Sequence, residues 1–413
     1  MSKNESSWQK VRLDGIGESL IGLTYSPDNV KRSGTLVLRS SNIQSGRLTF
    51  DDVVYVNSTI PDKIRVREDD ILICVRNGSR RLIGKSVLLD RRVVGQTFGA
   101  FMAVYRSEAN PYLQYFFQSD DFKRQIDEHL GATINQITNG SLNSFIVALP
   151  NAAEQREIVS RLSDVDRYIA TLERLIAKKQ VVKQGMMQQL ITGRTRLPGF
   201  TESWRTSSLG AIGNCLRGVS YDPNFDLSPN DRPFTVRLLR SNNIQNGHLE
   251  LRDVQFVHER KVNKKQLVRH NDILVCLANG SKDLVGKSAI LQFPTGARKY
   301  TFGAFMGIFR TDKRLADPRF IANLLQAKSF RDMLDVALAG SSINNLRPGD
   351  VEAFVTKMPP MAEQGAIADT LSDAELEIQL LNVRLIKARS IKKGMMQELL
   401  TGRTRLPAAE ASL

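Results

Sequence analysis

The sequence lacks the features of a membrane or secreted protein. No apolar run approaches the roughly 20 residues that a membrane-spanning helix needs. The first residues, MSKNESSWQK, contain neither the basic start nor the apolar centre of a secretory signal. We therefore expect a soluble, cytoplasmic protein that begins near Met1.

Cysteine and histidine are scarce. The 3 cysteines show no C-x-x-C spacing, and Cys74 and Cys276 lie inside apolar runs, so we interpret the cysteines as small core residues. The 4 histidines lack the spacing that would place two metal ligands on one helix face. The sequence therefore predicts no metal site.

Positive charge, by contrast, is in excess. There are 58 Lys and Arg residues against 43 Asp and Glu, which gives a formal net charge of +15. Such an excess indicates a polyanionic partner, and nucleic acid is the commonest one. Charge alone is equally compatible with a basic protein that has no such ligand.

The clearest pattern is an internal repeat. GMMQQLITGRTRLP, from Gly185, returns as GMMQELLTGRTRLP, from Gly394. LRSSNIQSGRL returns as LRSNNIQNGHL, DDILICVRNGSRRLIGKS returns as NDILVCLANGSKDLVGKS, and TFGAFM occurs at Thr97 and at Thr301. The chain therefore uses one unit twice, each copy taking about half of its length.

Each copy contains a β-rich part followed by a helical part. From about residue 8 to 150, short β-rich runs such as ILICV are separated by turn signals, and the helical signal is limited to stretches such as 110–130. After Pro150, apolar residues recur at alternating spacings of four and three, which predicts a long helix with a narrow apolar seam. A seam of this width needs a partner helix, and the second copy supplies one.

We therefore predict an α+β fold with two similar globular domains, separated by two long antiparallel helices that form a coiled-coil-like spacer with internal pseudo-two-fold symmetry. The predicted boundaries are 1–150 for the first domain, 151–196 for the first helix, 197–360 for the second domain, and 361–413 for the second helix and C-terminal tail.

Four segments carry a resemblance to a known family. LRSSNIQSGRL, the DILICVRNGS…GKS block, NAAEQREIVSRLSDVD and GMMQQLITGRTRLPGF resemble the specificity subunit of type I restriction-modification systems. The resemblance covers essentially the full length and both copies. It implies two target-recognition domains that each read one part of a split DNA sequence, and spacer helices that also dock methyltransferase subunits.

The resemblance also implies what the chain does not do. Two modification subunits are expected to bind S-adenosylmethionine and methylate adenine, and restriction subunits are expected to use ATP and Mg, so this chain itself binds no cofactor. The sequence agrees, because its one Pro-Pro pair follows Met358 rather than the Asn or Asp of an adenine methyltransferase motif, and no Walker A loop is present. A free-standing bipartite DNA-binding scaffold without enzymatic partners is the alternative.

Candidate DNA contacts lie on two repeated loops. In SNIQSG and its copy, amides that can bind adenine stand near arginines that can bind guanine. The same residues are also typical of tight turns, in which the amide side chains only hydrogen-bond to backbone groups. The candidates in this loop and its copy are Arg39, Asn42, Gln44, Arg47, Arg240, Asn243, Gln245 and His248.

The second loop is RNGSRRLIGKS, with ANGSKDLVGKS as its copy. Lys85 and Lys287 occur in both copies, which favours phosphate contacts, because these carry no sequence information. Arg76/Ala278, Arg81/Asp283 and Arg47/His248 differ between the copies, as two distinct half-sites require; solvated surface charge is the alternative. The candidates here are Arg76, Asn77, Ser79, Arg80, Arg81, Lys85, Asn279, Ser281, Lys282 and Lys287.

Overall fold

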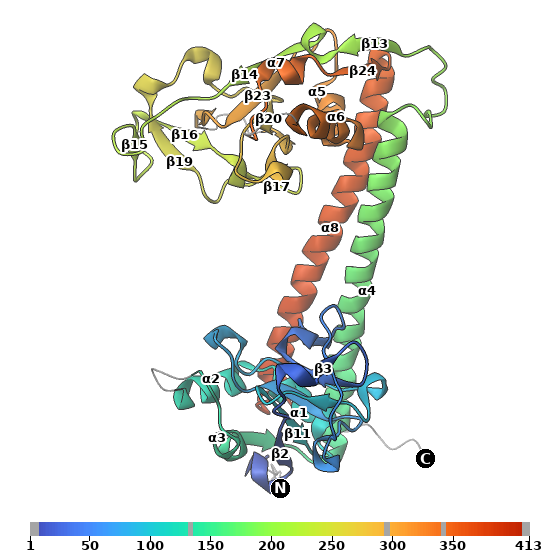
Figure 1. The fold of residues 1–413 in the computed structure, drawn as a ribbon, viewed down its shortest axis with the longest axis vertical. Coiled ribbons are helices and arrows are strands. Elements are labelled where there is room, and N and C mark those ends of the chain that lie inside the picture. Colours follow the sequence, from blue (N-terminus) through green and yellow to red (C-terminus); the bar gives the residue numbers. More distant parts are fainter. Residues whose placement is uncertain (1–7, 131–134, 293–297, 340–343, 407–413) are drawn as a thin grey trace, which may run out of the picture. The chain divides into compact units, whose positions relative to one another are not determined.

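The computed structural model describes residues 8–130, 135–292, 298–339 and 344–406 (Figure 1). The chain divides into two compact units: unit 1 is Met1–Glu173 with Val383–Leu413, and unit 2 is Arg174–Asn382. Both boundaries fall inside long helices, α4 (Ala152–Ile191) and α8 (Met361–Leu399). Each unit therefore contains one part of each long helix. Among the described residues, none of the helices could cross a membrane.

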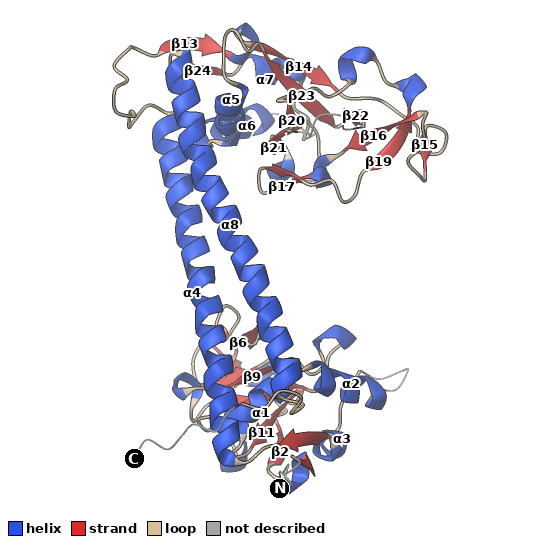
Figure 2. Cartoon of the chain, turned by 180° about the vertical axis from the view of Figure 1, so that it is seen from behind, coloured by secondary structure: helices blue, strands red, loops and turns tan. Residues whose placement is uncertain are grey.

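Two four-stranded sheets form the centre of unit 1 (Figure 2). One is antiparallel throughout, in the order β2 (Glu18–Ile21), β11 (Met102–Arg106), β8 (Ile71–Cys74) and β9 (Ser86–Leu88). In the other, β10 (Thr97–Phe98) runs parallel to β4 (Thr35–Leu38), followed by β7 (Tyr55–Val56) and β3 (Val30–Lys31). Two smaller pairs join β1 (Gln9–Arg12) to β12 (Ile146–Leu149) and β5 (Ile43–Gln44) to β6 (Arg47–Leu48).

Three short helices complete this domain: α1 (Asn110–Phe116), α2 (Asp120–His129) and α3 (Asn139–Ser144). The single helical stretch predicted over 110–130 is thus two helices. The reason is Ser119, whose hydroxyl accepts a hydrogen bond from the Phe122 N–H and so begins a new helix.

The apolar strand β8 supplies side chains to two hydrophobic clusters. All of its residues are buried. Because successive side chains of a strand point to opposite faces, Ile71 and Ile73 enter the cluster that includes α1, α2 and the long helices, whereas Leu72 and Cys74 enter the cluster between the two sheets. Cys74, Cys215 and Cys276 are free and buried, which confirms their interpretation as core residues.

Unit 2 repeats this plan. Its sheets have the orders β14 (Gly213–Arg217), β23 (Met306–Thr311), β20 (Ile273–Cys276), β21 (Ser288–Ile290) and β15 (Leu227–Ser228), β19 (Gln255–His258), β16 (Thr235–Leu239), β22 (Tyr300–Phe302). The smaller pairs are β13 (Arg205–Ser208) with β24 (Val355–Met358) and β17 (Ile244–Gln245) with β18 (His248–Leu249). Its helices are α5 (Pro318–Gln326), α6 (Lys328–Ala339) and α7 (Pro348–Glu352). The mixed α+β fold with two similar domains is confirmed.

The two long helices run antiparallel within unit 1. Asp166 of α4 pairs with Lys392 of α8 at 2.7 Å, and Glu173 pairs with Arg389 at 2.8 Å. The residue number rises along α4 while it falls along α8, which defines the antiparallel direction. Lys392 is a charged residue within the predicted apolar seam, and Asp166 on the facing helix pairs with its charge.

Unit 2 shows the same direction. Lys179 of α4 pairs with Glu377 of α8 at 2.7 Å, and Lys183 pairs with Glu375 at 2.5 Å. The Lys183–Glu375 pair occupies the place in the repeat that Lys392–Asp166 has in unit 1. The polar positions of both seams are therefore paired charges on facing helices.

The repeated TGRTRLP segment fastens the helices at their ends. In unit 2, Gly193 ends α4 with φ of 68°, and a side chain there would lie 3.2 Å from the Trp204 ring. Arg196 donates two hydrogen bonds, of 2.5 and 2.7 Å, to the buried carboxylate of Glu363 near the start of α8. The Trp204 indole N–H donates to the same carboxylate at 3.0 Å.

Unit 1 has the matching arrangement. Gly402 follows α8 with φ of 71°. Arg405 donates to Glu154, near the start of α4, at 2.7 Å, and the Trp8 indole N–H donates to Glu154 at 3.1 Å. The end of each helix is fastened to the start of the other, which explains why one chain carries this segment twice.

Candidate nucleic-acid interface

Three loops come together at one surface of unit 1: residues 39–42 after β4, residues 75–85 after β8, and the turn 99–101 before β11. The Lys85 ammonium donates to the Ser40 carbonyl at 3.3 Å, and the Asn77 amide donates to the Ser40 hydroxyl at 3.4 Å. The Val75 and Arg76 N–H groups both donate to the Phe101 carbonyl at 3.1 Å. The structure therefore joins the two loops that carry most of the predicted candidates.

Unit 2 joins the corresponding loops in the same way. The Asn279 amide donates to the Ser241 hydroxyl at 3.4 Å. The Leu277 and Ala278 N–H groups donate to the Phe305 carbonyl at 2.9 and 3.0 Å. One three-loop site is thus built twice in the chain.

Asn42 and Asn243 are turn residues, and we correct the prediction that they bind DNA. Asn42 is fully buried; its carbonyl oxygen accepts from the Arg39 N–H at 2.8 Å, and its amide donates to the carbonyls of Thr49 and Asp52. Asn243 makes the equivalent contacts. Both amide hydrogens are used, so neither residue could bind adenine without dismantling its turn. The alternative interpretation, turn chemistry, applies to these two residues.

Arg39 and Arg240 stay at the half-buried rim of the site. Arg39 pairs with Asp52 at 2.7 Å, and Arg240 pairs with Asp253 at 3.1 Å. The Nε–H of each arginine is buried without a hydrogen-bond partner among the residues that the structure describes. Both guanidinium groups therefore have donor capacity left.

The hairpin tips turn toward the long helices. Ser45 and Gly46 have positive φ, as a tight hairpin turn requires. Next to this turn, Arg47 pairs with Glu173 of α4 at 2.5 Å, and His248 in the second hairpin pairs with Glu375 of α8 at 2.9 Å. In this structure Arg47 and His248 therefore attach hairpin to helix, and their base contacts stay a prediction.

Their hairpin neighbours Gln44 and Gln245 are exposed. The Gln245 amide donates to the Asn242 carbonyl at 2.9 Å.

These attachments keep the helix carboxylates ionised. Burial by itself would raise the pKa of Glu375, but His248 and Lys183 outweigh it and lower the pKa to about 2. Burial likewise opposes ionisation of Glu173, and Arg389 and Arg47 together bring its pKa below the ordinary value.

Replacing Glu375 by Gln is expected to lower the free energy of unfolding of unit 2 by about 1 kcal/mol at pH 7, since the pair is only partly buried. The pKa of Glu375 is lower in the folded than in the unfolded protein. Its stabilisation is therefore complete above the unfolded value of 4.5 and is lost as the pH falls toward 2. Urea unfolding followed by Trp204 fluorescence at pH 7 and pH 3 measures the difference, which should shrink at pH 3. Glu377→Gln, at a more exposed pair, is the control; a pH-independent difference would contradict the expectation.

Residues 76–85 present the remaining cations. Arg76, Arg80 and Arg81 are exposed, whereas Lys85 is half-buried. Arg80 pairs with Asp127 of α2 at 3.3 Å, and Lys282 pairs with Asp335 of α6 at 3.7 Å. Exposed pairs of this kind contribute little stability. Both cations could therefore exchange a carboxylate for a phosphate at low cost.

The turn of this loop is held by amides. The Asn77 carbonyl oxygen accepts from the Ser79 N–H, and Asn279 does the same with Ser281, both at 3.0 Å. The hydroxyls of Ser79 and Ser281 lie on exposed residues. Lys287, the counterpart of Lys85, is half-buried at the end of its loop.

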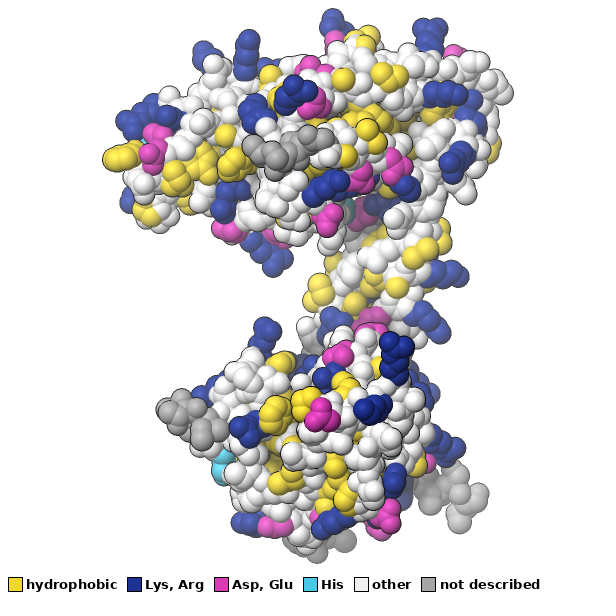
Figure 3. Space-filling model, viewed as in Figure 1, with side chains coloured by type: hydrophobic (Ala, Val, Ile, Leu, Met, Phe, Trp, Pro, Cys, Tyr) yellow, Lys and Arg dark blue, Asp and Glu magenta, His cyan; other side chains and the backbone are white. Residues whose placement is uncertain are grey.

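In unit 2 the site forms a hollow of about 1110 Å³. Its walls include Tyr221, Arg240, Asn242, Asn279, Phe305 and Asn344. Of the predicted residues of unit 2, Arg240 and Asn279 line this hollow. The others do not: Asn243, Gln245, His248, Ser281, Lys282 and Lys287. On the face shown in Figure 3, hydrophobic side chains of each unit lie among lysines and arginines.

Comparison with known proteins shows what parts of the chain are similar to. Residues 5–184 match the type I restriction modification DNA specificity domain. The StySPI specificity subunit of Salmonella potsdam is 31% identical over 207 residues, 50% of this chain and 43% of that protein. The EcoKI specificity subunit of Escherichia coli K12 is 31% identical over 201 residues, 49% of this chain and 42% of that protein. A solved chain from a type I R-M system has a TM-score of 0.62 at 16% identity, covering 98% of this chain and 100% of that one. These comparisons assign residues 5–184 to the type I restriction modification DNA specificity domain.

These matches cover part of each relative in sequence, and nearly the whole chain in fold. The matches span less than half the length of the two curated specificity subunits. At 16% identity the structural similarity concerns the fold alone. The internal repeat extends the specificity-domain plan to the second half of the chain, because unit 2 has the same sheet orders as unit 1.

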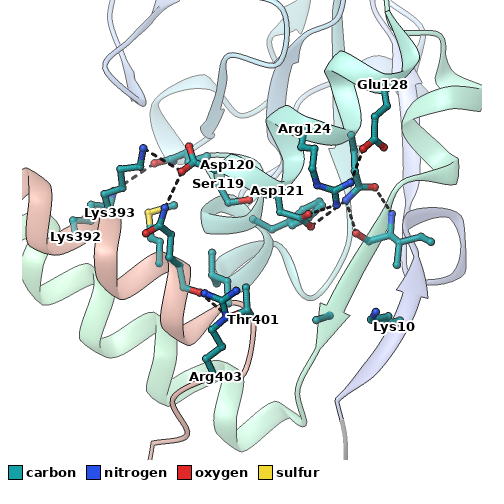
Figure 4. A pocket seen from close by; sticks show the side chains of 18 of the residues that line it. Lys10, Ser119, Asp120, Asp121, Arg124, Glu128, Lys392, Lys393, Thr401 and Arg403 are labelled. Carbon is teal, nitrogen blue, oxygen red and sulfur yellow. Dashed lines mark hydrogen bonds and ion pairs between the residues drawn. The ribbon is translucent and has the colours of Figure 1, made fainter.

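A second hollow, of about 1130 Å³, lies between α2 and the last part of α8 in unit 1 and contains none of the predicted residues. Figure 4 shows Asp120 of α2 facing Lys393 of α8, at 3.1 Å, and Asp121 facing Arg124. The three carboxylates of this hollow, Asp120, Asp121 and Glu128, are paired with Lys393 and Arg124. No group of three or more metal-ligating side chains occurs among the described residues.

Sequence reasoning missed two residues of the site, Phe101 and Phe305. Their side chains are 58% and 72% exposed beside the joined loops. The signal was available in the sequence, because TFGAFM is identical in both copies. A largely apolar segment such as TFGAFM is ordinarily predicted to lie in the core. Only the turn in the folded chain shows that its second phenylalanine points outward while its buried neighbours point inward.

Proposed function

We propose that this chain is the DNA-specificity subunit of a type I restriction-modification complex. Each sheet-rich domain reads one half of a bipartite target, and α4 and α8 set the spacing between the half-sites and dock the methyltransferase subunits. The observation that carries this proposal is the three-loop site built twice, with different side chains at its exposed positions.

The differences between the copies assign roles to the side chains. Arg76 faces solvent where unit 2 has Ala278, and Arg81 is replaced by Asp283, so these positions would read bases. Lys85 and Lys287 are shared and would bind phosphate. Lys85 uses one of its three donors on Ser40, which leaves two for a phosphate oxygen.

The proposed partners would supply the activities for which this chain has no sequence motif. With no methyltransferase or nucleotide-binding motif of its own, it would supply recognition, while two modification subunits bind S-adenosylmethionine and methylate adenine. Restriction subunits would use ATP and Mg for translocation and cleavage. Mapping methylated adenines in DNA from cells that express this chain with its modification subunit tests the assignment. A bipartite methylated sequence is expected, and its absence would contradict the proposal.

The division between base and phosphate contacts predicts two different outcomes for two substitutions. Arg76→Ala should relax one position of one half-site by roughly 1–3 kcal/mol. Lys85→Ala should weaken binding to all duplexes and reduce the slope of log K against log salt by about 1. Fluorescence anisotropy with specific and random duplexes at several salt concentrations measures both. Arg91→Ala, at an exposed arginine outside the loops, is the control, and equal losses on specific and random DNA for both test variants would refute the division.

A further inference from the structure

Phe101 and Phe305 occupy an unusual position. Each is the exposed residue of a turn between two buried segments: Phe98 and Met102 on either side of the first turn are 0% and 1% exposed. The phenylalanine between them is 58% exposed, and its counterpart Phe305 is 72% exposed. Exposing a phenyl ring gives up the free energy that burial would provide, and the same exposed ring recurs at the equivalent turn of both domains.

The outward direction of the ring is enforced by the backbone. The Phe101 carbonyl accepts two N–H groups from the end of β8, and the Gly99 N–H donates to the Leu38 carbonyl of β4 at 3.0 Å. In unit 2 the Phe305 carbonyl accepts two N–H groups, and the Gly303 N–H donates to the Leu239 carbonyl at 3.0 Å. The turn is thus tied to both sheets, and the ring is presented on a fixed support.

Cationic or amide side chains lie beside each ring. The Arg76 guanidinium lies over the Phe101 ring at 5.2 Å. Phe305 shares its hollow with Arg240, Asn279 and Asn344, each of which has N–H donors beyond the bond it makes within the chain. A flat ring beside cationic and amide donors suits a nucleobase, which has an aromatic face and polar edges. The excess of positive charge on the chain also favours a polyanionic partner.

We propose that Phe101 and Phe305 are stacking residues, each of which packs its ring against a base that is partly unstacked from the duplex in the half-site bound by its own domain. This rests on the proposed function. Stacking is tolerant of sequence, since every base has an aromatic face. An identical phenylalanine in both domains would therefore supply affinity, while the differing Arg76 and Ala278 beside it supply discrimination.

The domains differ in how the ring is presented. In unit 1, Arg76 covers one face of the ring, so a base would pack on the other face, in the order arginine, ring, base. Ala278 leaves Phe305 without such a cover, in agreement with its greater exposure. Phe101 should accordingly be the more ordered of the two rings in free protein.

The test uses the full-length chain and duplexes selected by it from a library with two randomised segments. Phe101→Ala should lower affinity roughly 5- to 150-fold through one half-site, and Phe305→Ala should do so through the other. The salt slope should not change, because no phosphate contact is lost. Phe101→Trp should restore binding. Phe234→Ala, at a 55% exposed ring stacked on His258, is the matched control and should bind as the unaltered chain does.

A second measurement locates the contact. With 2-aminopurine at successive positions of the selected half-site, fluorescence should change at one position, and Phe101→Ala should abolish that change. Unchanged melting temperatures of the variants exclude misfolding.

The outcomes separate the two proposals. If the unaltered chain binds no duplex selectively, the proposed function fails and stacking with it. If it binds but both alanine variants bind equally well, only stacking is overturned. Stacking is also overturned if the variants lose affinity together with salt slope, or lose only assembly with a methyltransferase subunit, which would make the rings a protein contact.

Discussion

Replacing Asp70 by Ala is expected to lower the free energy of unfolding of unit 1 by about 3–5 kcal/mol. Asp70 is 1% exposed and accepts two hydrogen bonds from Arg106, of 2.8 and 2.7 Å, and one from the Arg67 N–H at 2.8 Å. Removing the carboxylate leaves a largely buried guanidinium without its counter-charge, which costs far more than an exposed pair would.

The two tryptophans make this expectation measurable unit by unit. Trp8 belongs to unit 1 and Trp204 to unit 2, and the sequence has no third. In a Trp204→Phe background, Trp8 fluorescence during urea unfolding should show the lower free energy of unfolding of unit 1. In a Trp8→Phe background, Trp204 fluorescence should show an unchanged free energy of unfolding of unit 2. Asp272 pairs with Arg310 in unit 2 as Asp70 pairs with Arg106 in unit 1. Asp272→Ala should therefore destabilise unit 2 and leave unit 1 unchanged.

Two controls sharpen the result. Asp70→Asn keeps the shape and one acceptor oxygen and should lose less than Asp70→Ala. Asp62→Ala, at a fully exposed carboxylate paired with Arg65, should leave the transition in place. A loss below about 1 kcal/mol for Asp70→Ala would show that the Arg106 pair behaves as a solvated one.

The consequence for DNA binding should be confined to one half-site. Asp70 immediately precedes β8, and β8 leads into the loop that carries Arg76 and Lys85. Loosening this strand would release the loop in unit 1 only. Half-site binding measured under conditions where both units are folded should therefore fall for one half of the target.

Replacing Glu363 by Ala should destabilise unit 2 by about 3 kcal/mol. Glu363 is 0% exposed and accepts from Arg196 twice and from the Trp204 indole. Without the carboxylate, the indole N–H loses its acceptor and α4 is no longer fastened to the start of α8. Because Trp204 touches the altered site, its fluorescence should report both the changed environment and the lower urea midpoint.

The matched variant is Glu154→Ala in unit 1, at a carboxylate whose side chain is 14% exposed and which binds Trp8 and Arg405. A smaller loss is expected there, because Glu154 is better solvated. If both variants unfold like the unaltered chain, the repeated segment does not fasten the helices, and its duplication needs another explanation.

The candidate site was only partly predictable. Comparing the copies could single out the shared lysines and the differing arginines of the second loop, and their DNA contacts stay predictions. Arg76 and Arg81 are exposed, as expected for loop residues, whereas Lys85 and Lys287 are half-buried. Asn42 and Arg47 could not be assigned. Their roles depend on the carbonyl of Asp52 and on Glu173, which the chain brings near only when folded. Phe101 was missed because an apolar residue between apolar neighbours has no local mark of exposure.

By itself, the sequence determined the duplication, the two long helices and the resemblance to type I specificity subunits, since each depends on residues close together in the chain: identical segments and an apolar spacing of three and four. The tertiary structure alone decided which polar side chains of the repeated loops are consumed by the fold and which remain for a ligand. The physical reason is that burial and hydrogen-bond pairing are properties of groups brought together from distant parts of the chain, as with Glu363 and Arg196.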